Sequence, residues 1–140
     1  MVLVGRASAA VILVSLTVLL QSVGMATIIR WIRAHQARGT HPFTILRSSV
    51  LLVRFTSAIL ILHLLQILLW AGFYRWNCFP SWDAAFYFSA ESYSTVGYGD
   101  LILPLTWRNL GPAESITGVL MCGISAALLF AIVLRLAQRE

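Results

Sequence analysis

Three long apolar runs determine what this chain can fold into. The first extends from Ala7 to Ile29 without a charged residue, and two more extend from Phe55 to Tyr74 and from Ile116 to Leu134. A helix of roughly 20 such residues crosses the hydrocarbon layer of a bilayer, which is about 30 Å thick. Only 11% of the residues are charged, whereas soluble domains carry roughly a quarter. We therefore predict an all-α membrane protein with three spanning helices.

The breaks between these runs divide the chain into three parts. Residues 1–38 are predicted to form an N-terminal transmembrane helix with a basic end. Residues 39–54 form a basic cytoplasmic connector in which Gly39 and Pro42 interrupt the helix. Residues 55–140 contain the other two spanning runs. The first run fits a signal peptide poorly, because its positive charges follow the apolar stretch and only one arginine precedes it.

The arginines predict the orientation of the spanning helices, because basic residues favour the cytoplasmic side. Seven of the ten arginines fall on one side of the predicted bundle. We expect this side to be cytoplasmic in a multi-pass protein of the cell membrane, plasma or inner, with the N-terminus outside and the C-terminus inside. The opposite, outer side then holds four of the five acidic residues, Glu114 among them. The seven cytoplasmic arginines are Arg30, Arg33, Arg38, Arg47, Arg54, Arg135 and Arg139.

A short segment between the second and third runs cannot span the bilayer. Ser81 is a typical N-cap and Asp83 suits the positive end of a helix dipole, so residues 82–94 are predicted to be helical. That helix is too short to cross about 30 Å. Glycine-rich chain follows it, and such irregular backbone is tolerated at membrane depth only where it lines a water-filled cavity or is buried in protein. We therefore predict a re-entrant loop.

The stretch TVGYGD, residues 95–100, has a composition suited to binding cations through backbone carbonyls. An ion that crosses a membrane needs other oxygens to replace its hydration shell. Successive carbonyls turn to one side only with unusual dihedral angles, which glycine adopts without steric penalty. In this stretch two glycines alternate with larger side chains, behind a threonine hydroxyl and ahead of the Asp100 carboxylate. The candidate ion ligands are Thr95, Val96, Gly97, Tyr98 and Gly99.

TVGYGD resembles the selectivity filter of potassium channels, and the resemblance covers roughly Phe55 to Leu134. It implies an outer helix at 55–74, a pore helix at 82–94, the filter at 95–100 and an inner helix at 112–136. The N-terminal helix is additional to this pattern. The implied activity is passive, potassium-selective conduction, with K⁺ as the permeant ion and no other cofactor. The implied K⁺ ligands are Thr95, Val96, Gly97 and Tyr98.

The same resemblance implies several chains around one pore. The chain contains one filter segment and no internal repeat, so a ring of carbonyls requires more than one copy. The family implies a homotetramer, closed by heterologous contacts around an axis that runs along the pore.

The resemblance also implies residues that support the filter. In small bacterial two-helix potassium channels a glutamate lies four residues before the filter threonine, which is the place of Glu91. An aromatic residue four positions earlier, here Tyr87, commonly reaches the aspartate that ends the filter, here Asp100. We expect Glu91 and Asp100 to lie close together and to share one proton; the alternative is that Glu91 points into outer water. Gly123 occupies the place of a hinge glycine, although Gly118 and Gly123 could equally serve close helix packing.

Two other functions remain open from the sequence. GYGD also fits the G-x-G-D pattern of intramembrane aspartyl proteases, which need a second aspartate on a neighbouring spanning helix. The only other aspartate is Asp83, at the start of the short helix, so we expect no enzymatic activity. A non-conducting, channel-like membrane subunit is the other alternative.

The remaining polar residues have simpler interpretations. His63 and Gln66 lie one turn apart in the second run, where hydrogen bonds between helices explain them at least as well as a functional role. Arg47 and Arg54 share a helical face near the cytoplasmic boundary, where they snorkel to headgroups or bind an anionic lipid. The arginines are scattered and form no polar stripe, so we expect no nucleic-acid partner.

Overall fold

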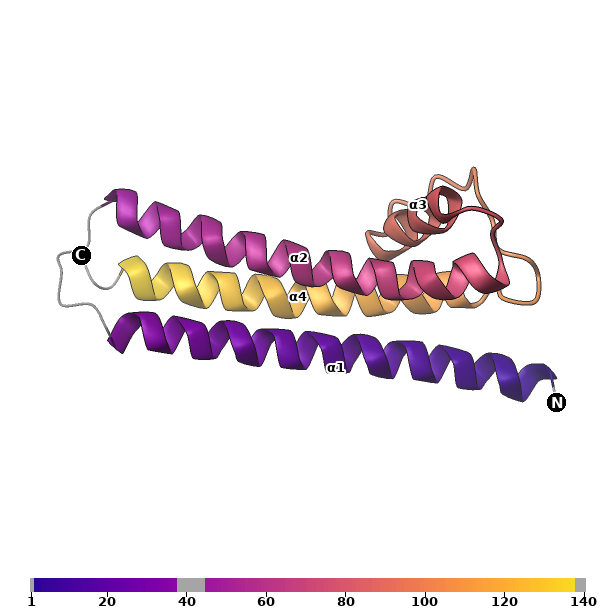
Figure 1. Ribbon diagram of the computed structural model, residues 1–140, viewed down its shortest axis with the longest axis horizontal. Coiled ribbons are helices and arrows are strands. Elements are labelled where there is room, and N and C mark those ends of the chain that lie inside the picture. Colours follow the sequence, from indigo (N-terminus) through magenta and orange to yellow (C-terminus); the bar gives the residue numbers. More distant parts are fainter. Residues whose placement is uncertain (1, 38–44, 138–140) are drawn as a thin grey trace.

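The computed structural model is a bundle of three long helices with a short fourth helix packed against one end (Figure 1). The structure describes residues 2–37 and 45–137. Helix α1 spans Val2–Ala37, α2 spans Ile45–Asn77, α3 spans Trp82–Tyr93 and α4 spans Leu110–Ala137. None of the described residues is in a strand, which confirms the predicted all-α class.

The three long helices correspond to the three apolar runs. Their segments Gly5–Ala34, Ser49–Asn77 and Leu110–Leu134 are each long and apolar enough to cross a membrane. Most side chains in each segment are not buried within the chain, which is expected of helices whose outer surfaces face lipid or other subunits. The protein is therefore a multi-pass membrane protein.

The helix boundaries differ from the prediction at several points. Helix α2 begins at Ile45 rather than at residue 55, so residues 45–54 of the predicted connector are helical. This stretch contains no glycine or proline, and its arginines are good helix formers, so charge does not end the helix there. Helix α3 ends at Tyr93 with Ser94 as its C-cap, and α4 begins at Leu110 rather than at residue 112.

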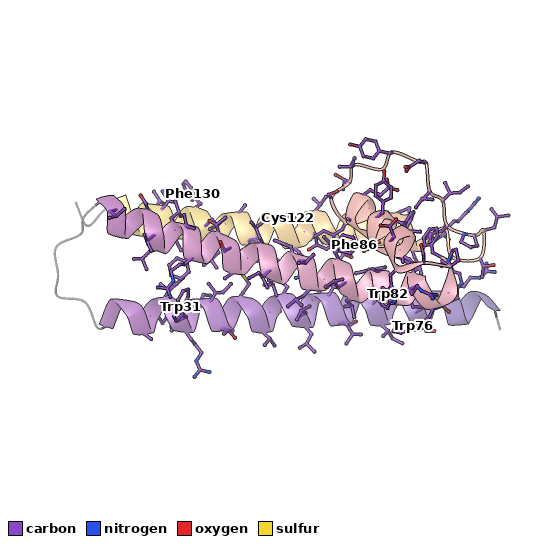
Figure 2. The ribbon with its side chains drawn as sticks, turned by 45° about the horizontal axis from the view of Figure 1, so that its top comes forward. Trp31, Trp76, Trp82, Phe86, Cys122 and Phe130 are labelled. Atoms are coloured by element: carbon purple, nitrogen blue, oxygen red, sulfur yellow. The ribbon has the colours of Figure 1, made fainter. Side chains whose placement is uncertain are left out.

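Some of the predicted positions lie outside what the structure describes. Gly39 and Pro42, the breakers in the predicted connector, are among them. The cytoplasmic arginines Arg38 and Arg139 lie outside the described residues as well, and so do the side chains of Arg47 and Arg135. Trp31, which is labelled in Figure 2, belongs to α1. The guanidinium carbon of Arg54, on α2, lies 5.1 Å from the centroid of the Trp31 ring. The anionic-lipid hypothesis at Arg47 and Arg54 stays a prediction.

Two apolar clusters hold the bundle together. One lies near the short helix and joins all four helices and the loop before α4; its buried members are Leu13, Trp70, Tyr74, Ala85, Phe88, Leu103 and Leu110. The other joins the three long helices through Ile28, Ile32, Phe55, Ile59 and Ile132. Because the first cluster takes residues from every element around α3, the short helix is held on both its α2 side and its α4 side.

Helix α3 begins as the sequence predicted. The Ser81 hydroxyl accepts a hydrogen bond from the backbone N–H of Ala84 at 3.2 Å, and Asp83 lies in the first turn. The chain enters this region from the end of α2 and leaves it into the start of α4, at the same end of the bundle (Figure 1). This arrangement is that of the predicted re-entrant segment, with the short helix and the glycine-rich loop between two spanning helices.

Candidate functional site

The loop after α3 alternates between two backbone conformations. Thr95, Gly97 and Gly99 have φ angles of 61°, 54° and 78°, and Val96 and Tyr98 between them are not in the positive-φ region. When residues of positive φ alternate with residues of negative φ, successive N–H groups can turn to one side of the chain and their carbonyls to the other. Positive φ was expected at Gly97. At Thr95 it is a strained conformation that the surrounding structure maintains.

Three successive N–H groups of this loop point back to one residue of α3. The backbone N–H groups of Val96 and Gly97 donate to the Glu91 carbonyl oxygen at 2.9 and 3.3 Å. The N–H of Tyr98 donates to Glu91 Oε2 at 3.2 Å. The opposite side of the loop therefore presents its carbonyl oxygens. Within the part of the chain that the structure describes, residues 94–100 are all exposed, Tyr98 to 75%.

Glu91 is the residue that orients this loop. Its side chain is 6% exposed, so the alternative in which Glu91 points into outer water is wrong. Both its main-chain carbonyl and its carboxylate accept hydrogen bonds from the loop. Because Glu91 lies in the last turn of α3, the apolar packing of that helix is transmitted directly to the loop backbone.

A second hydrogen bond holds the outer end of the loop. The hydroxyl of Tyr87 donates to Asp100 Oδ2 at 3.0 Å, as the family resemblance implied, and the N–H of Leu101 donates to Asp100 Oδ1 at 3.1 Å. The hydrogen bond to Asp100 raises the pKa of Tyr87 above its ordinary value. Glu91 and Asp100 are thus bound by different donors, and the proton shared between them stays a prediction.

We expect Glu91→Ala to change the slow decay of current and to leave ion selectivity largely intact. The substitution leaves the N–H of Tyr98 without its acceptor, and a hydrogen bond to a charged group contributes about 1.5–3 kcal/mol, so the decay rate should change by about tenfold or more. Current recordings from reconstituted protein in symmetrical potassium solutions measure this rate. Indistinguishable decay in wild type and Glu91→Ala, at acid and at neutral pH, would contradict the role of Glu91.

Tyr87→Phe is the matched variant for the outer hydrogen bond. A tyrosine whose pKa is raised in the folded state stabilises that state below its unfolded pKa of about 10, and this contribution is lost as the pH rises through the folded value. The contribution of this hydrogen bond to wild-type decay should therefore be lost at strongly alkaline pH, and Tyr87→Phe should lack that alkaline change.

The last turn of α3 lies directly against α4. The Ser115 hydroxyl donates to the Ser92 carbonyl oxygen at 2.7 Å. A Cβ atom at Gly118 would lie closer than 3.0 Å to the carbonyl oxygen of Tyr93, so only glycine permits this approach. Close packing, one of the two roles considered for these glycines, is therefore confirmed for Gly118. Gly123 has no neighbour within 4 Å of such a Cβ, and its role as a hinge stays a prediction.

A buried carboxyl group in α4 is the feature that the sequence analysis missed. Glu114 was expected on the outer aqueous side, but its side chain is fully buried. Its Oε2 accepts from the Tyr74 hydroxyl at 2.8 Å and its Oε1 from the Ser89 hydroxyl at 2.6 Å. Glu114 thereby joins α2, α3 and α4 behind the loop. The only sequence signal was an acidic residue in the first turns of a spanning helix, where such residues face the interior and need a partner.

Metal ions in proteins commonly bind to sets of His, Cys, Asp and Glu side chains. Among the residues that the structure describes, no group of three or more His, Cys, Asp or Glu could hold a metal ion.

Comparison with families of known proteins gives an independent assignment. A family described as "Ion channel" matches residues 54–135, which is more than half of the 140-residue chain. The chain belongs to this ion channel family. No curated protein and no solved structure matches it. The matched residues include α3, the loop at residues 95–100, most of the spanning part of α2 and nearly all of α4, and they leave α1 outside.

The channel family points to a transporter rather than to an enzyme. In the structure Asp83 lies in the first turn of α3 and Asp100 lies in the loop, so neither aspartate is on a spanning helix. An intramembrane aspartyl protease places its two carboxylates on neighbouring spanning helices, where they share a proton. The geometry of this channel therefore gives the protease alternative no support.

Proposed function

We propose that this channel conducts potassium ions passively and selectively through a homotetrameric pore, lined by the backbone carbonyls of residues 95–99. The observation that carries the proposal is the set of three successive N–H groups, from Val96 to Tyr98, that all point to Glu91. Their carbonyls are consequently free on the other side, as a filter that replaces the hydration shell of an ion requires.

One chain supplies one column of carbonyls, so the pore needs neighbouring copies. Apolar side chains of α3 and α4 are exposed in the single chain, among them Phe86, Cys122 and Phe130, which are labelled in Figure 2. A closed ring of four chains would cover such surfaces by heterologous contacts and would bring four filter loops to one axis. The Tyr98 side chain, exposed in the single chain, would pack against the neighbouring loop in that ring.

The orientation in the membrane follows from the arginines. The N-terminus of α1 and the filter loop lie at one end of the bundle, and the start of α2 and the end of α4 lie at the other (Figure 1). Since more arginines accompany the second end, it is the cytoplasmic one on the positive-inside rule. The filter is then at the outer side of a cell membrane, plasma or inner.

Liposomes that contain the purified protein should take up potassium and rubidium but little sodium. We expect a flux ratio of potassium to sodium of at least about tenfold, which corresponds to about 1.4 kcal/mol of discrimination. Protein-free liposomes from the same preparation are the control. Equal potassium and sodium flux would overturn the selectivity, and the absence of any flux would favour the non-conducting subunit.

A further inference from the structure

A continuous series of buried hydrogen bonds joins α1 to the pore region. Gln66 Nε2 on α2 donates to Gln21 Oε1 on α1 at 2.7 Å, and the hydroxyl of Tyr93, the last residue of α3, donates to Gln66 Oε1. His63 Nδ1 lies 2.8 Å from the same hydroxyl oxygen. Because Tyr93 has one hydroxyl proton and gives it to Gln66, His63 must donate through Nδ1. Hydrogen bonding between helices, one of the two roles considered for His63 and Gln66, is confirmed.

The same Gln21 side chain also reaches α4. Its Nε2 donates to Ser125 Oγ at 3.0 Å and to the Met121 carbonyl oxygen at 3.3 Å. These two residues lie on either side of Gly123, and in an α-helix the carbonyl of Met121 is the acceptor for the N–H of Ser125. Gln21 therefore binds the turn of α4 that contains Gly123. A bend at Gly123 would separate the two acceptors from the amide.

Burial makes these contacts specific. Gln21 is 2% exposed, Gln66 is fully buried and Ser125 is 3% exposed. In hydrocarbon no water can replace a lost hydrogen-bond partner of a buried amide. The Oε1 of Gln21 therefore depends on Gln66, and its Nε2 depends on the Met121 carbonyl and the Ser125 hydroxyl. The family match leaves α1 outside its residues, yet α1 contributes the one side chain that bonds to both α2 and α4 in this series.

We propose that Gln21 is a positioning residue through which α1 restrains α4 across Gly123 and, through Gln66 and Tyr93, steadies the end of α3 beside the filter. The role rests on the proposed conduction. Helix α4 continues through Gly123 without a break. Bending at this predicted hinge is the movement expected to open the pore, so a restraint on the unbroken helix favours the closed arrangement. The N-terminal helix α1 thereby opposes the bending of α4 that would open the pore.

Gln21→Met tests the proposal, because it keeps the length of the side chain and removes every hydrogen bond of the amide. Single-channel recordings should show a rise in open probability of roughly three- to tenfold, the range that a few interhelical hydrogen bonds in membranes provide. Hydrogen exchange of the backbone amides in residues 119–127 should become faster. The potassium-to-sodium selectivity should not change.

Thr17→Val is the matched control. Thr17 lies one turn before Gln21, is fully buried, and accepts a hydrogen bond from Trp70 Nε1 at 2.9 Å. Its loss weakens the α1–α2 contact without removing a bond to α4, so it should lower thermal stability and leave open probability and exchange near wild type. Ser125→Ala removes one acceptor of Gln21 with little change in volume. It should raise open probability, as Gln21→Met does. This second variant still tests the proposal if Gln21→Met does not assemble.

The outcomes separate the inference from the function on which it rests. Unchanged open probability and unchanged exchange in both Gln21→Met and Ser125→Ala would overturn the proposed restraint, as would equal changes in Thr17→Val. If wild type does not conduct, the proposed function fails. In that case faster exchange of residues 119–127 in Gln21→Met alone would still support the restraint of α4 by α1.

Discussion

Gly97→Ala should abolish potassium conduction or its selectivity. Gly97 has a φ angle of 54°, and no atom lies within 4 Å of the Cβ that alanine would add. The effect therefore arises from the backbone, where the left-handed region costs an ordinary residue about 1–2 kcal/mol. Alanine relieves that cost if the peptide rotates, which breaks the hydrogen bond from its N–H to Glu91 and turns a carbonyl out of line. In a tetramer the defect occurs four times around one axis.

The loop already holds one non-glycine residue in this region. Thr95 has a φ angle of 61°, so the surrounding hydrogen bonds sustain a single strained residue in each chain. Gly97→Ala would place a second strained residue in the same short segment. We therefore expect selective conduction to be lost rather than reduced. Ion flux into liposomes in potassium and in sodium measures the result. Gly5→Ala is the control, because Gly5 is helical and also has nothing within 4 Å; selective flux through Gly97→Ala would refute the proposed filter.

Gly118→Ala should destabilise the protein by up to about 2 kcal/mol. Overpacking a well-packed contact costs about 1–3 kcal/mol, and the preference of a helix for alanine over glycine offsets about 1 kcal/mol of it. The added Cβ meets the carbonyl oxygen of Tyr93, which is backbone and cannot rotate away. Helix α4 must then move from the end of α3, and the hydrogen bond from Ser115 to the Ser92 carbonyl, 2.7 Å long, is weakened. Thermal unfolding in detergent measures the balance.

Gly123→Ala is the matched control in the same helix. It makes the same chemical change where the other described residues, the helix's own backbone aside, leave the space within 4 Å of the new Cβ empty, so thermal stability should be kept or slightly raised. Its effect should instead appear as a lower open probability, because alanine stiffens the predicted hinge. If Gly118→Ala is as stable as wild type, the contact between α4 at Gly118 and the Tyr93 carbonyl oxygen does not require glycine. If Gly123→Ala leaves open probability unchanged while tetramer stability falls, Gly123 is a packing residue and not a hinge.

Local features of the site could be predicted from the sequence. The Ser81 cap, the short helix, positive φ at Gly97 and the contact of Tyr87 with Asp100 are all present in the structure. Each depends on residues within about a dozen positions of one another, through hydrogen bonds of a cap, the steric freedom of glycine or a family motif. The α2 boundary was misplaced because the prediction relied on charge, whereas residues 45–54 contain neither glycine nor proline and their arginines are good helix formers.

By itself the sequence determined that this chain spans a membrane three times and carries a re-entrant, glycine-rich loop, because the length of an apolar run and the chemistry of glycine act locally. Only the tertiary structure decided which buried polar groups are partners. Glu114 meets Tyr74 and Ser89, and Gln21 meets Gln66 and Ser125, across separations of 25 to 104 positions in the chain. Such pairs depend on how helices are rotated and offset against one another. That arrangement is set by the packing of their apolar side chains and by the close approach that Gly118 allows.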